Sequence, residues 1–359
     1  MEFEKEKCGY FPQLTGVRAV AAYLVYVYHT NPFSYEFSPF LNHLVNEFHI
    51  GVSIFFVLSG FLITFRYFNL SIDTKGWFLK YATNRMARVY PMYFIITTVS
   101  FLFLLIQGKE GDNSLFVYFT NITFLRGFFD NLKFTLVAQG WSLTTEECFY
   151  FFAPLLFIFL KKTKWFLLYT SLILILLGSL LVEVFREVNY YGFFNSYSFM
   201  FNYTFFGRCF EFICGSWLAL YFHRRQPIEK AGNKYTYIGL SLMSLLVIAM
   251  SLFAESKPEV YTFFGIVINN FLLPVSISIL FYGLIVEQTS IRLVLNSSVL
   301  VLLGKSSYTF YLIHIGFPYL LINQYVTTNY AFVFLILNII AIGLWYFVED
   351  PLNVSIRKI

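Results

Sequence analysis

Charged residues are scarce in this sequence. Asp, Glu, Lys and Arg make up 13% of its 359 residues, about half their share in a soluble domain. Hydrophobic residues make up 58%, and no soluble fold of this length could keep so much apolar surface away from water. The composition therefore excludes a water-soluble protein and indicates an integral membrane protein, whose apolar faces are covered by lipid.

Cysteine is scarce too, and familiar motifs for metals and nucleotides are absent. The four cysteines have no paired spacing and three lie in apolar runs, so we expect neither a disulfide framework nor a bound metal. Phosphate-binding glycine loops, dinucleotide fingerprints and zinc-protease motifs do not occur. The basic residues are divided among short segments, which argues against nucleic-acid binding. The polar first ten residues lack the features of a cleavable signal peptide.

Long apolar runs recur along the whole chain. A helix needs about 20 apolar residues to cross a bilayer. The sequence predicts one all-α domain over residues 1–359, a polytopic transmembrane bundle without a soluble appendage. Its spans, about ten in number, are expected at 13–31, 49–67, 89–106, 142–160, 165–182, 196–222, 235–253, 261–286, 298–322 and 331–348.

The basic residues are distributed unevenly between alternate connections. With the N-terminus in the cytoplasm, 17 of the 25 Lys and Arg residues fall in inner segments and only 5 in outer ones. Cytoplasmic loops carry an excess of Lys and Arg, so both termini are predicted to be cytoplasmic. The longest outer segment, 107–141, contains apolar patches, and we expect part of it to lie in the membrane interface or to fold back into the bundle.

The first predicted span carries two polar side chains. Arg18 and His29 are eleven residues apart, close to three helical turns, so they share one face and lie about 16 Å apart along the axis. Arginine can bind phosphate, and histidine can act as a general base near neutral pH. The alternative is structural, with an arginine that reaches the interface and a hydrogen-bonded histidine.

Two further polar groups flank the third and fourth spans. Arg85 and Arg88, three residues apart, share a helix face and could form an anion site or a plain cytoplasmic anchor. Glu146 and Glu147 are adjacent and point in different directions, while Glu146 shares a face with Tyr150. Glu146 could orient the His29 imidazole, or it could belong to a structural ion pair.

The later spans contain two more polar groups. Arg208 and Glu211 allow a salt bridge within one helix, for which a structural role is favoured. Ser307, Tyr311 and His314 form one stripe on the ninth span, either a substrate contact or polar helix packing.

Small residues occur in the second span as well. Gly51, Ser59 and Gly60 would let another helix or a ligand approach closely.

Seven segments in order resemble the acyltransferase 3 family of bacterial membrane acyltransferases. They are LTGVRAVAAYLVYVYH, GVSIFFVLSGFLI, NRMARVYPMYF, WSLTTEECFY, RCFEFICG, GKSSYTFYLIH and VEDPLN, which together run from about residue 12 to residue 354. Two positions depart from the family pattern. Thr15 replaces the usual acidic residue three before the first arginine, and Ala19 replaces the glycine that follows it.

The resemblance implies an O-acyltransferase that moves an acyl group, most often acetyl, to a sugar hydroxyl. It implies acetyl-CoA or another acyl-CoA as the donor substrate, no permanently bound cofactor, and an acceptor such as O-antigen lipopolysaccharide, peptidoglycan, exopolysaccharide or a lipid-linked precursor. It also implies a multi-pass protein of the bacterial inner membrane, with the lipid bilayer as its surroundings. The oligomeric state is left open.

The polar residues suggest roles for this reaction. Arg85 and Arg88 would bind the phosphates of acyl-CoA, and Arg18 a deeper part. His29 would be the catalytic base or acyl carrier, and Glu146 would orient it. Ser307, Tyr311 and His314 would line the substrate site and could stabilise the oxyanion.

Two other classes remain possible from the residues alone. A transporter or flippase for a glycolipid or an anion would also carry charges in its spans, although no internal repeat is evident. A non-catalytic scaffold of a polysaccharide complex would not need His29 or Glu146.

Overall fold

The computed structural model describes residues 10–68, 76–107, 114–160, 166–188, 190–225, 232–253 and 263–358. This described part is helical and has no strand, apart from an isolated bridge between Phe129 and Phe193. The predicted all-α class is confirmed. The chain divides into two compact units, and four helices have residues in both of them, namely α7, α8, α10 and α15.

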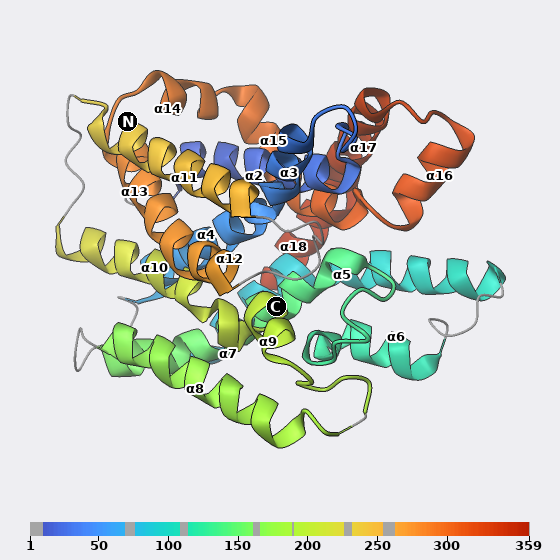
Figure 1. The fold of residues 1–359 in the computed structure, drawn as a ribbon, viewed down its shortest axis with the longest axis horizontal. Coiled ribbons are helices and arrows are strands. Elements are labelled where there is room, and N and C mark those ends of the chain that lie inside the picture. Colours follow the sequence, from blue (N-terminus) through green and yellow to red (C-terminus); the bar gives the residue numbers. More distant parts are fainter. Residues whose placement is uncertain are drawn as a thin grey trace. The chain divides into compact units, whose positions relative to one another are not determined.

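The first unit contains residues 1–70, 156–175 and 207–305. Within it, α13 packs against α2, α4 and α11 (Figure 1). Its elements are α2 (Pro12–Thr30), α3 (Pro39–Asn46), η1 (Glu47–Ile50), α4 (Gly51–Tyr67), most of α10 (Phe205–Arg224), α11 (Lys234–Phe253), α12 (Phe263–Val267), η4 (Ile268–Leu272), α13 (Leu273–Val286) and α14 (Ser290–Leu295).

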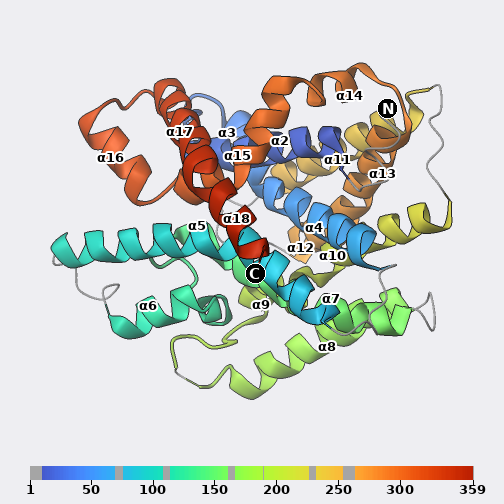
Figure 2. The same ribbon diagram turned by 180° about the vertical axis from the view of Figure 1, so that it is seen from behind.

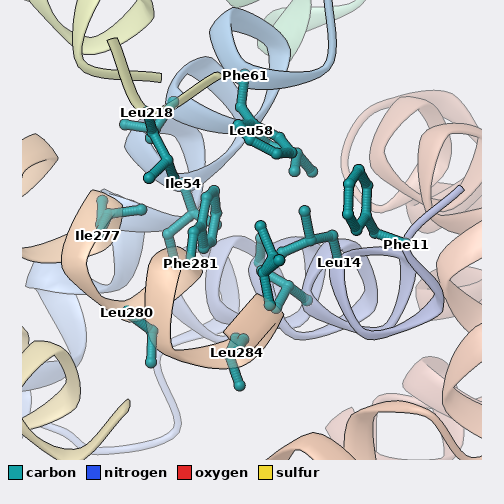
Figure 3. Close-up of a cluster of buried hydrophobic side chains, with 14 of the residues drawn as sticks. Phe11, Leu14, Ile54, Leu58, Phe61, Leu218, Ile277, Leu280, Phe281 and Leu284 are labelled. Atoms are coloured by element: carbon teal, nitrogen blue, oxygen red, sulfur yellow. The ribbon is translucent and has the colours of Figure 1, made fainter. Parts of the chain in front are cut away.

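The core of this unit is a cluster of aliphatic and phenylalanine side chains from α2, α4, α10 and α13. Leu14, Ile54, Leu218 and Phe281 are all buried in it, and Figure 3 shows these side chains converging from four helices. Between helices in a bilayer, such contacts stabilise through close van der Waals packing. The cluster therefore holds α2 and α4, which carry the first two sequence motifs, against α13.

Glycines on α4 and α10 permit close contact between neighbouring helices. A Cβ atom at Gly60 would overlap the backbone of Phe212 in α10, and one at Gly215 would overlap the backbone of Val57 in α4. A Cβ atom at Gly51 would overlap the backbone of Ala21 in α2. The close helix approach predicted for Gly51 and Gly60 is confirmed.

We expect Gly60→Ala to lower the free energy of unfolding by about 1–3 kcal/mol, because the added methyl group must force α4 and α10 apart. Thermal unfolding of the purified protein in detergent would measure this. Gly343→Ala in a later helix is the matched control, since its Cβ would meet no atom within 4 Å and alanine is the better helix former. Equal stability of the Gly60→Ala protein and the wild type would contradict the expectation.

The second unit contains residues 71–155, 176–206 and 306–359. Here α18 and α6 both pack against α5 (Figure 2). The elements are α5 (Trp77–Gln107), α6 (Leu115–Ile122), η2 (Leu125–Phe128), η3 (Ala138–Gly140), most of α7 (Trp141–Leu160), α9 (Tyr197–Tyr203), α16 (Phe317–Tyr325), α17 (Tyr330–Leu344), η5 (Trp345–Glu349) and α18 (Asp350–Arg357). Both units share α8 (Phe166–Phe185) and α15 (Ser298–Ile313). Helix α6 lies within the predicted outer segment 107–141 and packs against the long helix α5. Part of that segment therefore folds back onto α5.

Seven stretches of the described residues are helical, long and apolar enough to cross a membrane: 39–67, 77–107, 138–160, 166–185, 234–253, 263–286 and 330–357. The bent pair of α15 and α16 would make an eighth. The remaining two predicted spans are helical as α2 and α10, but polar residues such as Arg18 and Arg208 lower their hydropathy.

The count of ten and the cytoplasmic termini stay predictions. Nine basic residues used for the topology lie outside the described residues: Lys5, Lys7, Lys75, Lys109, Lys161, Lys162, Lys164, Lys230 and Lys257.

Two of the predicted helices are interrupted. The segment 196–222 divides at Thr204, whose backbone is extended and whose hydroxyl donates to the carbonyl of Met200 at 2.7 Å. The segment 298–322 bends by 84° between α15 and α16, where Gly316 has φ 85° and ψ −153°. Apolar sequence continues through both breaks, so hydropathy alone does not reveal them.

Candidate active site

Helix α2 carries both residues of the predicted arginine–histidine pair. It runs without a break from Pro12 to Thr30, which is the condition for Arg18 and His29 to share a face. Pro12 stands in the first turn, where its missing N–H removes no helical hydrogen bond. Arg18 is half-buried, and His29, in the last turn of α2, is an exposed residue.

A second imidazole, that of His49, lies near His29. The ring of Tyr28 is 4.6 Å from the His29 ring and 5.8 Å from the His49 ring, centroid to centroid. Nδ1 of His49 lies 3.0 Å from the carbonyl oxygen of Asn46, and its side chain is 12% exposed. Both His29 and Arg208 act on it electrostatically. His49 had no predicted role, because only the packing of η1 on α2 brings it here.

The predicted Arg208–Glu211 salt bridge is confirmed as a bidentate pair. The distances are 2.7 Å from Nε to Oε2 and 2.8 Å from Nη2 to Oε1, and both side chains are almost wholly buried. Nη2 also donates to the hydroxyl of Ser53 at 3.0 Å, and the guanidinium lies 5.3 Å from the centre of the Phe56 ring. These contacts connect α4 to α10 and support the structural role.

A π-helical turn, η4, adds two buried amides to this group. Ser53 donates to Oδ1 of Asn269 at 3.3 Å, and Nδ2 of Asn270 donates to the carbonyl of Gly207 at 3.2 Å. Such turns shift the residues that follow them on a helix and occur often at functional sites. Here η4 places polar side chains beside the Arg208–Glu211 pair.

The second unit contains the predicted Arg85 and the two adjacent carboxylates. The Tyr150 hydroxyl donates to Oε1 of Glu146, so these two residues share a helix face as predicted. The Arg85 guanidinium lies 5.7 Å from the centre of the Tyr150 ring, and its charge acts on Glu147. Glu147 is 6% exposed, and its Oε1 has no hydrogen-bond partner among the described residues. Both carboxylates therefore belong to one polar group with Arg85.

Arg88 lies beside a carboxylate that sequence analysis did not single out. Its Nη1 is 3.5 Å from Oε1 of Glu349, and the other oxygen of Glu349 accepts a hydrogen bond from Thr309 at 2.6 Å. Glu349 is buried at the end of the π-helical turn η5. Arg88 is therefore paired with a carboxylate in the structure, and its binding of phosphate stays a prediction.

The predicted stripe on α15 is buried. The Tyr311 hydroxyl lies 2.8 Å from Oγ of Ser142, at the start of α7. Nδ1 of His314 lies 2.7 Å from the Tyr311 carbonyl oxygen. His314 follows directly after the last residue of α15, and Ser307 is buried in its middle. The segments around Ser142 and Tyr311, both part of the family resemblance, thus meet in one unit.

Arg126 is the least expected buried residue. It belongs to the predicted outer segment 107–141, where a basic residue would be expected in contact with water, yet it is fully buried. Its Nη1 donates to Oδ1 of Asn121 at 2.5 Å and to the carbonyl of Thr135, and its Nη2 donates to the carbonyl of Val137. Burial lowers the pKa of the Arg126 guanidinium, but arginine stays charged in proteins. Arg126 therefore cross-links the segment that folds back onto α5 (residues 115–137, the folded-back segment).

The structure thus groups His29 with His49 in the first unit, and Arg85 with Glu146 in the second. The proximity of His29 and Glu146 joins residues of different units and stays a prediction. Among the residues that the structure describes, no group of three or more His, Cys, Asp or Glu side chains is placed to hold a metal ion.

Fold and site together define a multi-pass helical membrane protein with ionisable side chains on its helices. The chain belongs to the acyltransferase 3 family, whose acyltransferase domain matches residues 11–349. The resemblance seen in the sequence motifs is confirmed.

Several relatives carry names that refer to O-acetyl transfer. The peptidoglycan O-acetyltransferase of Listeria monocytogenes is 33% identical over 168 residues, which cover 43% of this chain and 25% of that protein. A Staphylococcus aureus protein whose name proposes an O-acetyltransferase is 24% identical over 96% of this chain and 58% of its own length. A Bacillus subtilis protein whose name proposes a peptidoglycan O-acetyltransferase is 25% identical, with 96% and 55% covered. This chain therefore spans little more than half the length of these two relatives, and no solved structure matches it significantly.

Proposed function

We propose that this protein is a membrane O-acetyltransferase that moves acetyl from cytoplasmic acetyl-CoA to a hydroxyl of a cell-surface glycan. The observation that carries the proposal is the family's opening span, present as one continuous helix with Arg18 and an exposed His29. Membership of the acyltransferase family and the names of the relatives support the reaction class. The protein would lie in the inner membrane of a bacterium. Peptidoglycan, O-antigen lipopolysaccharide and exopolysaccharide are the acceptors to test.

In the proposed reaction His29 acts on the acceptor hydroxyl. The imidazole takes the hydroxyl proton while the oxygen attacks the carbonyl carbon of the thioester. The tetrahedral intermediate collapses, the C–S bond breaks, and CoA leaves as a thiolate that takes up the proton held by His29, which restores the neutral imidazole. A variant of this sequence has His29 accept the acetyl group first and pass it to the sugar.

The other predicted site residues are proposed to have three roles: binding the donor, orienting His29 and stabilising the oxyanion. Acetyl-CoA is a polyanion, so the guanidinium groups of Arg85, Arg88 and Arg18 are proposed to bind its phosphates and the adjoining arm. Glu146 is proposed to orient His29. The buried stripe of Ser307, Tyr311 and His314 offers hydrogen-bond donors for the oxyanion.

The test is transfer of radiolabelled acetyl from acetyl-CoA into glycan by membranes that contain the protein. We expect label in an ester that alkali releases, and none with membranes that lack the protein. Absence of an ester product with every acceptor and donor would overturn the acetyltransferase assignment.

A second test addresses the donor site. We expect Arg88→Ala to raise the KM for acetyl-CoA by about tenfold, the loss typical of a charge-assisted hydrogen bond. Glu349→Gln is the matched variant, because it keeps the shape of the partner 3.5 Å away but removes its competing charge. It should leave the donor KM unchanged or lower it. An equal rise in both variants would mean that the pair serves only to fix α5 to η5.

Transport is the second candidate function, favoured by one observation. The α15–α16 span is broken by an 84° bend, and broken helices line the binding sites of many transporters. Formation of a new ester by the purified protein separates the two candidates, because a pure transporter makes none.

A further inference from the structure

A cavity of about 490 Å³ in the second unit lies where the α15–α16 span is broken. Its wall comes from the end of α5, from the segment before α7, and from Gly316 and α16, all in this unit. Its volume is in the usual range for small-molecule sites. None of its lining residues is charged, and they include the amides of Gln107, Asn323 and Gln324 together with the rings of Phe103, Phe134 and Phe317.

The break between α15 and α16 is stabilised by a glycine backbone conformation and by side-chain hydrogen bonds. Gly316 has φ 85° and ψ −153°, a conformation essentially limited to glycine. Gln139, next to the lining residue Ala138, donates from Nε2 to the carbonyls of Tyr311 (2.7 Å) and Leu312 (2.6 Å). These are orphan acceptors of the last turn of α15. Irregular backbone at membrane depth is tolerated where it is buried or lines an aqueous cavity, and Gly316 lines this one.

The lining chemistry fits a sugar. In the described structure the side-chain amides of Gln107, Asn323 and Gln324 make no hydrogen bond, so their donors and acceptors face the cavity or solvent. An amide can both donate to and accept from a hydroxyl. Phenylalanine faces carry partial negative charge and pack well against the weakly positive C–H face of a pyranose ring. The absence of cationic side chains from the lining disfavours the phosphates of CoA and acidic sugars alike.

A second cavity provides a contrast. It lies in the first unit, has a volume of about 380 Å³, and is lined by apolar and aromatic residues such as Phe210, Trp217 and Ile279, without any amide side chain. The cavity at the helix break therefore combines aromatic faces with several amides, whereas this second cavity has aromatic faces without amides.

We propose that the cavity beside Gly316 is the acceptor subsite and binds one uncharged pyranosyl unit of the glycan. The proposal rests on the proposed acetyl transfer and adds the place and the charge class of the acceptor. Gln107, Asn323 and Gln324 bind the sugar hydroxyls, and the phenylalanines pack against its ring.

The experiment measures binding and catalysis separately. Purified protein in detergent is titrated with neutral tetrasaccharides of N-acetylglucosamine, glucose and galactose, and with tetragalacturonate as the anionic counterpart. We expect at least one neutral sugar to bind, tetragalacturonate not to bind, and the Gln107→Ala/Asn323→Ala double variant to bind about tenfold or more weakly. Asn131→Ala, an exposed amide of the same unit outside the cavity, should bind as the wild type does.

The activity arm distinguishes failure of this proposal from failure of acetyl transfer. The double variant should raise the KM for the glycan acceptor and leave the KM for acetyl-CoA unchanged. Wild-type acetylation with an unchanged acceptor KM in the double variant would overturn the subsite, as would binding of no neutral sugar or preference for the anionic one. Sugar binding to this cavity without any ester product would instead overturn the acetyltransferase function.

Discussion

Membranes that contain the His29→Ala protein should transfer acetyl label to glycan about 10²–10⁴ times more slowly than wild-type membranes, the contribution typical of a general base. If the imidazole carries the acetyl group itself, the loss should be complete to background. His29 is exposed at the end of a continuous α2, so its removal leaves no buried cavity. Initial rates of alkali-labile ester formation, at matched protein levels, measure the effect.

His43→Ala is the control for the loss of an imidazole. His43 lies on α3, is partly buried, and has no role in the proposed reaction. Its rate should equal that of the wild type. A His29→Ala protein that folds, inserts and retains the wild-type rate would exclude His29 as base and as acyl carrier.

His49 is expected to influence the reaction indirectly, through its position near His29. The Tyr28 ring lies near both imidazoles, and His49 and His29 act on each other electrostatically. His49→Ala should therefore change the pH dependence of the reaction more than its maximal rate. An unchanged pH profile would assign His49 a packing role only.

Sequence spacing predicted side-chain contacts correctly where both residues lie on one regular helix. Arg208 and Glu211 are three residues apart and form the expected pair, and Glu146 reaches Tyr150 one turn on. Helix periodicity fixes such contacts before any packing occurs. Periodicity did not predict the breaks at Thr204 and Gly316, because the chain turns there within apolar sequence and no change of hydropathy marks the position.

Contacts between distant segments could not be predicted in the same way. Ser53 and Asn269 are 216 residues apart, and Thr309 meets Glu349 from another helix. Asn269 and Glu349 both lie in π-helical turns, and a single inserted residue in a helix changes the face on which later side chains lie. Sequence spacing assumes a regular helix, so it assigned these residues no place in the site.

The folded-back segment depends on Arg126 in a way that its sequence does not reveal. Its guanidinium joins the end of α6, through Asn121, to the carbonyls of Thr135 and Val137 just before η3. A Cβ atom at Gly140 would overlap this guanidinium, so the start of α7 is built closely around it. The Val137 carbonyl also accepts from the Gly140 amide at 2.8 Å, but Oδ1 of Asn121 and the carbonyl of Thr135 would be buried without a donor if Arg126 were removed.

We expect Arg126→Ala to lower the free energy of unfolding by about 2 kcal/mol or more, since Oδ1 of Asn121 and the carbonyl of Thr135 lose their donor at about 1–3 kcal/mol each. Arg126→Lys should recover only part of this, because an ammonium group lacks the planar fork that reaches several acceptors. Thermal unfolding in detergent measures both variants. Arg186→Ala removes an arginine that is 50% exposed, and it should change stability by at most about 1 kcal/mol. If Arg126→Ala is as stable as Arg186→Ala, the guanidinium does not hold the segment, and the wall that Phe134 and Leu136 give to the acceptor cavity must be fixed by other contacts.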